Sequence, residues 1–453
     1  GVVDEPVGKI DTREEKDSII TNLRSLGRTT DYSQNTNINY QVPINKLPYL
    51  DFAQMTATYS ARYDWRAASL ATPKFENTIS NSQSYQINPT FNMSQLYGRS
   101  KYLKALMTPQ RNQISGNKNN PLEKMKVNKN AEQEKQDSIA RELNKNDLKK
   151  ILSRGLIMVR TVSFSYRQTN GQILPGYIPQ TDALGMDFGR NNAPGYGFVF
   201  GSQRDIRYDA AENGWITTYD SVSNRFARTN REEITGRINI EPLPDMRVDL
   251  NFARSIAFSY QEFFRYDNNV SSATYGKFRS FAETETGNFS MTVITLRSAF
   301  EKIDPEKGNS KFFETFMDNR YSMSQRLAIQ DGNFTTDSTG FFDGYGKYSQ
   351  QVLIPAFLAA YTGKSANNVN LNPFPKIPLP NWRINYSGLI KIPILAEYFT
   401  SFVINHSYTS TYNVNSFNRP TTTAERYISN NNYVPDYEIQ QITVSETFGP
   451  LIG

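Results

Sequence analysis

The chain has 453 residues with no cysteine, one histidine and a net charge of +6, which excludes disulfides, thiolate metal sites and cysteine nucleophiles and gives no reason to expect a nucleic-acid partner. Hydrophobic residues reach only 38% while aromatic residues reach 13%, so the sequence is poor in aliphatic core material and rich in residues typical of interfaces. No run approaches the roughly 18 apolar residues of a membrane-spanning helix, which leaves crossing by tilted strands of about 9 to 11 residues open.

Residues 1–31 are expected to form a loop with one helix before the first strand. The segment "DTREEKDSIITNLRSLG" has a capping box from Thr12 to Glu15, an apolar stripe and Gly27 as a C-terminal stop. Gly1 follows no signal peptide, and we expect the chain to be an inner section of a longer one.

Residues 32–95 are expected to form the first barrel strands. Runs at 32–44, 52–65 and 78–94 alternate apolar and polar residues, and "PINKLP" joins the first two as a hairpin. In the second run, one face carries Ala57, Tyr59, Ala61, Tyr63 and Trp65, and the other carries Gln54, Thr56, Thr58, Ser60 and Arg62. In a soluble sheet the apolar face would pack on a core, whereas in a membrane barrel it would meet lipid and the polar face would line a lumen.

Residues 96–155 form a lysine-rich insertion that is expected on the periplasmic side. Its segment 131–152 has helical spacing of isoleucine and leucine. A solvated helix surface is the default interpretation of its charges. The functional alternative is docking of an acidic periplasmic partner by Lys145, Lys149 and Lys150.

Residues 156–299 are expected to hold further strands, at 156–167, 232–240, 246–260 and 287–296. Long excursions lie at 169–230 and 263–285 here and at 330–380 further along. Those at 169–230 and 330–380 are too long to be simple connections, so they are expected to form folded extracellular or lumen-filling loops. The segment "GYGFVFG" lacks the spacing and context of a phosphate-binding loop and is interpreted as loop.

Residues 300–380 are expected to contain a periplasmic connection, one strand and a helical lumen or extracellular loop. If the short turns are periplasmic, the runs at 287–296 and 381–388 both point toward the periplasm. A strand that points toward the cell surface is therefore required between them. We place it at 319–329. The segment "SQQVLIPAFLAAYTG" predicts an apolar helix, and we hypothesise that its residues 352–361 pack against the inner wall or cap the lumen.

Residues 381–453 are expected to form the last strands, at 381–388, 401–416 and 439–448. His406 lies on the more apolar side of its run. We interpret it as a polar-tipped ring near a membrane interface and not as a pH sensor. Four aromatic residues near strand ends are interpreted as an aromatic belt, with a cargo-binding patch as the alternative: Tyr63, Trp65, Trp382 and Tyr412.

The strand lengths and connections predict an all-β fold, a section of a very large antiparallel transmembrane β-barrel with long loops and a few short helices. Several runs alternate for 10 to 16 residues, longer than the usual ~5 to 6 of soluble sheets. Short proline-rich turns on one side and long loops on the other are typical of outer-membrane barrels. Free strand edges in hydrocarbon would cost tens of kcal/mol, at several kcal/mol for each unpaired backbone group, so we expect further strands from outside this segment.

The sequence resembles the SprA/Sov family, the outer-membrane translocon of the type 9 secretion system of Bacteroidota. The resemblance lies in "GRTTDYSQNTNINYQVPINKLPYLDF", "YDWRAASL", "RTVSFSYRQTNGQILPGYIP", "INIEPLPDMRVDLNFARS" and "SQQVLIPAFLAAYTGKSANNVNLNPFPKIPLPNWRINYSGL". These stretches are spread over nearly the whole chain. The family protein is much longer, so this chain would be an inner section of it.

The resemblance implies a wide barrel in the outer membrane that passes folded cargo with a C-terminal signal to the cell surface. It implies as partners the rest of the same barrel chain, a PorV-type barrel, a plug protein, periplasmic accessory proteins, secreted cargo proteins and outer-membrane lipid. It also implies protein secretion and a role in gliding motility. It provides no catalytic, metal or cofactor residue, and we expect no enzyme.

Two other functions stay open. A TonB-dependent nutrient transporter would need a plug domain ahead of the strands. A soluble all-β adhesin or glycan-binding protein would suit the many aromatic and asparagine residues and would need no detergent.

Overall fold

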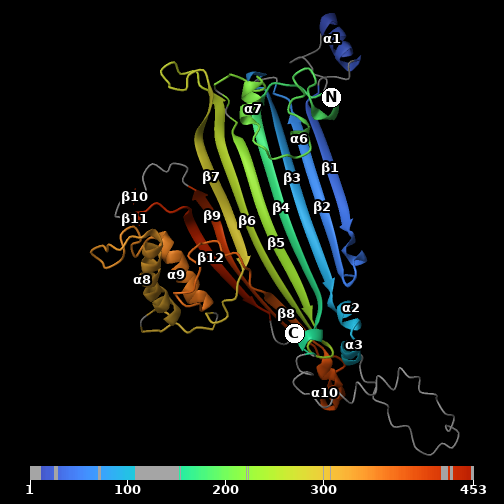
Figure 1. Cartoon of the computed structure of the whole chain (residues 1–453), viewed down its shortest axis with the longest axis vertical. Helices are drawn as coiled ribbons and strands as arrows, with labels where there is room; N and C mark the ends of the chain where they lie inside the picture. Colours follow the sequence, from blue (N-terminus) through green and yellow to red (C-terminus); the bar gives the residue numbers. More distant parts are fainter. Residues whose placement is uncertain are drawn as a thin grey trace, which may run out of the picture.

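The computed structural model describes residues 12–24, 29–69, 73–107, 153, 155–220, 222, 224–298, 300–306, 308–419, 427–428 and 432–449. Its main feature is one antiparallel sheet with the strand order β1-β2-β3-β4-β5-β6-β7-β9-β12, in which β8 pairs with β6 and β9 (Figure 1). The strands are β1 (Asp31–Val42), β2 (Ala53–Arg66), β3 (Asn77–Asn92), β4 (Val159–Tyr177), β5 (Phe226–Ile240), β6 (Met246–Tyr266), β7 (Phe278–Thr292), β8 (Asn381–Tyr386), β9 (Ile404–Arg419) and β12 (Glu438–Phe448). Two short strands, β10 (Tyr427–Ile428) and β11 (Asn432–Tyr433), pair with each other.

Short helices lie in the connections. They are α1 (Arg13–Arg24), α2 (Met93–Gly98), α3 (Lys101–Met107), α6 (Tyr196–Val199), α7 (Arg207–Glu212), α8 (Lys311–Asp331), α9 (Gln350–Thr362) and α10 (Pro393–Tyr398), with 3-10 turns η1 (Pro43–Lys46), η2 (Pro73–Phe75), η3 (Ala183–Gly185) and η4 (Gly388–Lys391). None of the helices in the described ranges is both long and apolar enough to cross a bilayer.

The strand and helix predictions hold for most elements. The expected all-β antiparallel sheet is confirmed, and β4 and β5 are longer than the sequence indicated. The capping box of α1 is confirmed, because the backbone N–H of Thr12 donates to Glu15 and the N–H of Glu15 donates to the Thr12 hydroxyl. The expected helix near Pro355 is α9. The expected helix at 131–152, with Lys145, Lys149 and Lys150, lies outside the described residues.

The strand predicted at 319–329 is wrong, because this segment lies in helix α8. Ser310 caps the helix N-terminus through the N–H of Phe313, and Gly332 ends it in the left-handed conformation. Met323 and Leu327 are four residues apart and both pack toward the core, as residues on one face of a helix do.

The predicted strands at 287–296 and 381–388 run in the same direction, and for this reason an extra strand was expected between them. In the structure they are two halves of one strand position. β7 pairs with the upper part of β6 and with β9, and β8 continues in the same direction along the lower part of β6. The N–H of Leu379 donates to the carbonyl of Thr292 where the halves meet. Residues 293–380, called the insertion below, therefore leave the sheet and return to it in mid-strand, so the alternation of strand directions needs no additional strand.

The sheet has two chemically different faces, because residues paired across strands share a face. The polar face carries hydroxyl, amide and charged side chains on every strand, among them those of Thr56, Ser84 and Asn413. The apolar face carries the opposite set, for example Tyr59, Ile87 and Tyr412.

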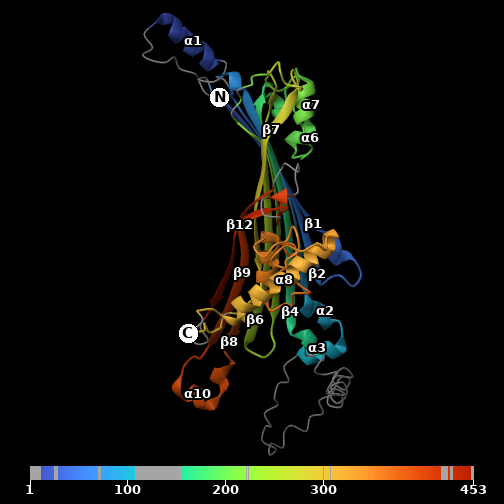
Figure 2. The ribbon, with the colours of Figure 1, turned by 90° about the vertical axis from the view of Figure 1, so that its left-hand side faces the viewer.

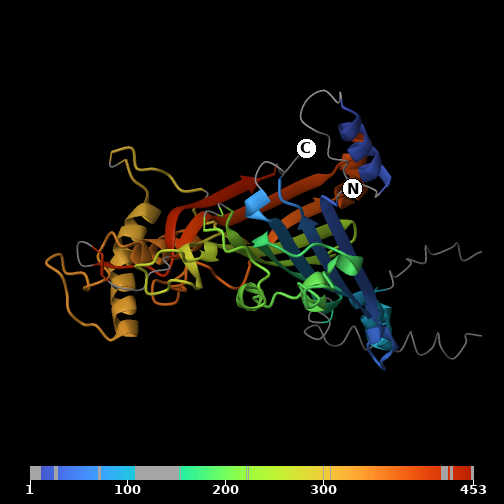
Figure 3. The ribbon, with the colours of Figure 1, turned by 90° about the horizontal axis from the view of Figure 1, so that it is seen from above.

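Two folded segments pack on the apolar face, and both lie on the same side of the sheet (Figures 2 and 3). The excursion, residues 178–225 with α6 and α7, covers the upper ends of β2 to β6 with a core that includes Tyr63, Ile79 and Leu174. The insertion, with α8 and α9, covers part of β6, β7, β9 and β12 with a core that includes Phe289 and Val414. At the upper end of the polar face, Arg225 of the excursion lies over the ring of Phe263.

Candidate functional site

The residues expected to line a lumen lie on the polar face. Register pairs place Gln54, Thr56, Thr58, Ser60 and Arg62 of β2 opposite further hydroxyl and amide residues of β1 and β3. The pairs include Thr58 with Asn39 and Gln86, and Ser60 with Asn37 and Ser84. This face is therefore hydrophilic across neighbouring strands, as the sequence predicted for β2 alone.

The lower part of the apolar face is left uncovered by the excursion and forms an apolar band across β1 to β5. Ile38 and Tyr40 of β1 are 56% and 57% exposed, and Tyr85 and Ile87 of β3 are also exposed. The other members are partly exposed: Met55, Ala57, Tyr59, Phe91, Val162, Phe164, Tyr166, Ile234 and Ile238. Contiguous apolar surface of this kind marks a contact with lipid or with another protein.

The band extends over part of the height of a bilayer core. On β3 it runs from Tyr85 to Phe91, and at ~3.4 Å per residue this corresponds to roughly 20 Å along the strand. The apolar belt of outer-membrane barrels is about 25 Å tall.

A row of polar residues bounds the band on its upper side. We call it the polar girdle: Asn81 and Gln83 of β3, Gln168, Asn170 and Gln172 of β4, and Arg228, Asn230 and Glu232 of β5. The register pairs these residues across the three strands, so they lie at one height on the apolar face. Above the girdle, apolar side chains return but are covered by the excursion.

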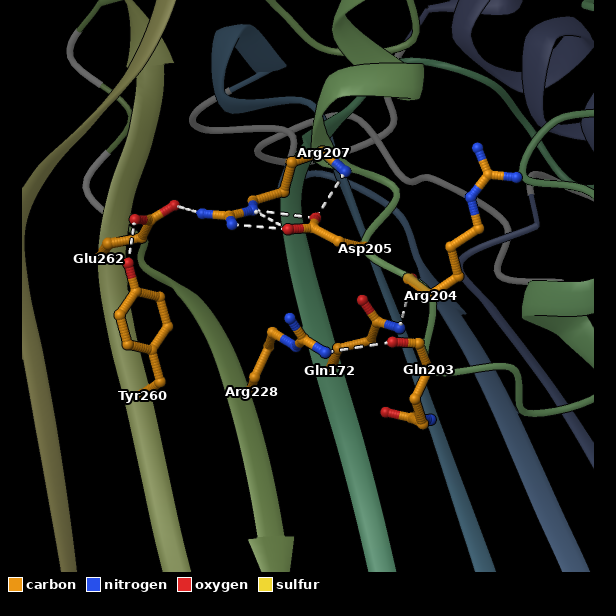
Figure 4. Close-up of polar contacts among 8 residues, drawn as sticks. All are labelled: Gln172, Gln203, Arg204, Asp205, Arg207, Arg228, Tyr260 and Glu262. Atoms are coloured by element: carbon orange, nitrogen blue, oxygen red, sulfur yellow. Dashed lines mark hydrogen bonds and ion pairs between the residues drawn. The ribbon is translucent and has the colours of Figure 1, made fainter.

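Girdle residues hold the excursion through its backbone carbonyls. The Nδ2 of Asn81 donates to the carbonyls of Phe198 (2.8 Å) and Ser202 (2.9 Å). The Nε2 of Gln172 donates to Ser202 and Arg204, and Arg228 donates to Gln203 (Figure 4). The Tyr59 hydroxyl adds a bond to Phe200. Four consecutive strands, β2 to β5, thus hold residues 198–204.

We call the contacts that hold the excursion to the sheet the clamp. A fifth strand, β6, contributes a buried ion pair to it. Glu262 of β6 is fully buried and pairs with Arg207 of α7, whose side chain is 11% exposed. Arg207 also binds Asp205, with Nη2 2.6 Å from its carboxylate, and its guanidinium lies over the ring of Phe226. The Tyr260 hydroxyl donates to Glu262 over 2.5 Å (Figure 4). Burial opposes ionisation of Asp205, but the hydrogen bonds and charge of Arg207 outweigh it and lower its pKa.

The aromatic-belt interpretation is wrong for three of its four residues. Tyr63 and Trp65 are buried beneath the excursion, where the indole Nε1–H of Trp65 donates to the carbonyl of Pro179. Tyr412 is buried beneath the insertion and donates to the carbonyl of Pro373. These aromatic residues near strand ends form the core under folded loops. The alternation pattern alone does not distinguish this environment from a lipid interface. Trp382 is partly exposed and stacks on Tyr408.

Two further predicted features have definite places. His406 is partly buried on β9, with Nδ1 3.3 Å from the carbonyl oxygen of Gly449. Helix α9 packs on the apolar face of the sheet, whereas Thr56 and Thr58 lie on the polar face, so residues 352–361 do not lie on the face that was expected to line a lumen. The apolar composition of α9 fits burial against either face of a sheet, so the sequence could not predict which face the helix covers.

The polar groups that hold the excursion bond to its backbone and to one another. These groups are amides, guanidinium groups and carboxylates. Within the described ranges, no group of three or more His, Cys, Asp or Glu residues is placed to hold a metal ion. No family model matches the chain, and no curated protein matches its sequence.

Sequence reasoning missed the girdle and its partner Arg207. A signal was present, because in β4 the positions of the apolar face read Leu174, Gln172, Asn170, Gln168 and Tyr166, which is an interruption of three polar residues. The partner Arg207 lies in the excursion, where no periodicity points to it.

Proposed function

We propose that this chain forms part of the wall of a very large outer-membrane β-barrel, the protein-conducting channel of a type 9 secretion system. The observation that supports it best is the pairing of an exposed apolar band with a hydrophilic opposite face on the same strands. A membrane wall needs this pairing, because one face meets hydrocarbon and the other meets water.

The proposal requires more strands than this sheet has. The outer edges of β1 and β12 pair with no other strand among the described residues. Each backbone group left unpaired in hydrocarbon costs several kcal/mol, so other strands must continue the wall at both edges. A wide barrel of this kind agrees with the resemblance to the SprA/Sov family.

The proposed cargo is inferred from the resemblance to the SprA/Sov family. The proposed substrates are folded proteins with a C-terminal signal, which pass along the polar face toward the cell surface. The PorV-type barrel, the plug protein and the periplasmic accessory proteins are proposed partners on the same ground. The girdle and the excursion would then lie on the cell-surface side of the bilayer, since the short turns lie at the opposite end of the strands.

A soluble all-β adhesin is the second candidate, and one observation favours it. The excursion and the insertion already cover parts of the apolar face with protein, as a soluble sheet requires. In that case another protein surface would cover the band as well.

Single-cysteine labelling separates the two candidates, because the chain itself contains no cysteine. We expect Thr58→Cys, in the full-length protein made free of other cysteines, to react with a water-soluble maleimide in intact outer membranes. The neighbouring Ala57→Cys should stay unlabelled there and react after detergent extraction. Equal labelling of both variants, or recovery of the protein without detergent, would refute the proposal that the sheet is part of a membrane-spanning wall. Export is tested separately, since depletion of the full-length protein should retain cargo in the periplasm.

A further inference from the structure

Three arginines surround one carboxylate on the polar face, at the end of the sheet where the short turns lie. They are Arg237 on β5, Arg247 on β6 and Arg383 on β8, three strands that lie side by side there (Figure 1). Asp249 of β6 accepts from Arg247 over 3.2 Å and pairs with Arg237 at 3.3 Å. Arg383 lies directly opposite Asp249 in the register. We call these four residues the arginine cluster, and its formal charge is +2 because three guanidinium groups meet one carboxylate.

The central carboxylate lies beneath the arginines. The Asp249 side chain is 8% exposed, whereas those of Arg237 and Arg247 are 50% and 56% exposed. Asn239 also donates to Asp249. Arg383 is exposed and has no ion pair or hydrogen bond among the described residues. The cluster therefore presents guanidinium N–H donors outward, while its one acceptor is already occupied from within the sheet.

The other charges at this end of the sheet are paired one to one. Arg160 pairs with Glu241 over 2.7 Å, and Lys391 pairs with Asp245. The polar face at the height of the cluster otherwise carries hydroxyl and amide side chains on the described strands, namely Thr90, Asn92, Thr161, Ser163, Asn251, Asn381, Ser407, Thr409 and Thr447. The charge of the cluster is thus not cancelled by its surroundings.

Two hollows adjoin the cluster. One, of about 290 Å³, is lined by residues that include Arg383, Asn385 and Asn405. The other, of about 460 Å³, includes Arg237 and Asn251 among its lining residues. Each hollow combines a guanidinium group with neutral amides, and each approaches or falls within the size range of binding pockets. The cluster therefore has room beside it for the side chains of a partner.

We propose that the arginine cluster binds an acidic segment of a polypeptide through its carboxylates. A guanidinium group presents two parallel N–H donors that match the two oxygens of a carboxylate. From a strand spacing of ~4.8 Å and a rise of ~3.4 Å per residue, the backbone of Arg383 lies roughly 8 Å from that of Arg247 and roughly 12 Å from that of Arg237. Acidic residues two or three positions apart in an extended chain are about 7 to 10 Å apart. Such a segment fits this spacing better than one small anion does.

The inference rests on the proposed function for the route of that polypeptide, because the cluster lies on the face that would line the channel. The short turns would lie on the periplasmic side, so the acidic segment would meet the cluster at the periplasmic entrance. The unbalanced charge acts over about 8 Å at physiological ionic strength. It would attract the segment before the ion pairs form.

The test measures binding of a fluorescent oligo-glutamate peptide to the purified full-length protein in detergent. An oligo-glutamine peptide of the same length is the reference. We expect the glutamate peptide to bind at least tenfold more tightly than the glutamine peptide, and this advantage should shrink as salt is added. Equal binding of the two peptides would overturn the inference.

Arg383→Gln is the sharpest variant, because no ion pair of the described residues is lost with Arg383. We expect it to weaken binding of the glutamate peptide about tenfold, the effect of losing one charge-assisted contact. Arg167→Gln is the matched control. Arg167 also lies on the polar face without an ion pair, but it stands opposite Glu233 and away from the cluster, so the affinity should stay within about twofold. Equal effects of the two variants would overturn the inference.

Two further variants change the charge of the cluster in opposite directions. Asp249→Asn is nearly isosteric and raises the charge by one, so the glutamate peptide should bind about threefold more tightly. Asn251→Asp adds a carboxylate opposite Arg237 at an exposed position and should weaken binding about threefold. A purely structural role of the cluster predicts no such reversal of sign. Unchanged affinity in Asn251→Asp would overturn the inference even if Asp249→Asn fails to fold.

Inorganic phosphate distinguishes a polypeptide site from a site for a small anion. Displacement of the glutamate peptide by phosphate at an equal concentration would overturn the assignment to a polypeptide. The proposed function is tested separately by the cysteine labelling at Thr58 and Ala57. If labelling refutes the membrane wall while peptide binding still depends on Arg383, the proposed function fails and the arginine cluster stands as a binding site. If labelling supports the wall and the two peptides bind equally, only the inference fails.

Discussion

The buried pair of Arg207 and Glu262 allows a sharp prediction about the clamp. Arg207→Met leaves the fully buried Glu262 with the Tyr260 hydroxyl as its remaining partner among the described residues. Removal of one member of a buried pair costs about 3–5 kcal/mol. Glu262→Gln should cost less, about 1–3 kcal/mol, because Arg207 keeps its contacts with Asp205 and a hydrogen bond is lost or weakened.

Hydrogen exchange of the amides in residues 198–207 measures this cost, since the excursion opens locally before the sheet unfolds. We expect at least ~100-fold faster exchange in Arg207→Met, at about tenfold for every 1.4 kcal/mol. Arg204→Met is the matched control, because Arg204 is 74% exposed and its pair with Asp209 is a surface pair worth at most about 1 kcal/mol. Exchange in Arg207→Met within twofold of wild type, or a larger effect of Glu262→Gln, would refute the reasoning.

Four further predictions follow from single positions. Ile87→Arg in the apolar band should destabilise the assembled wall by about 2–4 kcal/mol in denaturant titrations in a bilayer, while Asn88→Arg on the polar face should change it little. Asn81→Ala removes the donor to two carbonyls of the excursion, and trypsin should then cleave at Arg204 faster, consistent with a loss of about 1–3 kcal/mol. Gly287→Ala would place a Cβ against the ring of Phe417 and the carbonyl oxygen of Ala257 and should lower stability by about 1–3 kcal/mol, whereas Gly98→Ala meets no atom within 4 Å and should be neutral. Hydrogen bonds from Ser272 and Thr274 lower the pKa of Asp267 to about 2, so its contribution is complete above the unfolded value of ~3.9. That contribution is lost as pH falls from about 4 to 2, and Asp267→Asn should abolish this acid step in amide exchange of residues 267–279.

Alternation of residue types was sufficient to predict the strands and the two faces. Each strand from β1 to β6 was found by its period of two, and the hydrophilic face of β2 was assigned residue by residue. This works because the period depends only on local backbone geometry.

What covers the apolar face could not be predicted, because covering is a contact between segments far apart in sequence. Trp65 and Pro179 are joined by a hydrogen bond across 114 residues, and Tyr412 and Pro373 across 39. An aromatic side chain at a strand end is equally suited to lipid and to a folded loop. The split of one strand position into β7 and β8 was missed for a related reason, since strand parity assumes that each run occupies its own position.

The polar girdle explains how one face of a strand can serve two environments. Strands β1 to β6 have 12 to 21 residues, more than the ~9 to 11 that a bilayer requires. The residues beyond the bilayer would expose their apolar side chains to water, and the excursion covers them instead. A loop of backbone on the apolar face brings carbonyl groups that need donors, and Asn81, Gln172 and Arg228 supply them at the lower margin of that cover. In the proposed wall, the girdle would therefore separate the length of strand that a bilayer can cover from the length that only protein can cover. In sequence it is recognisable where the apolar positions of adjacent strands become polar for two or three steps and then revert.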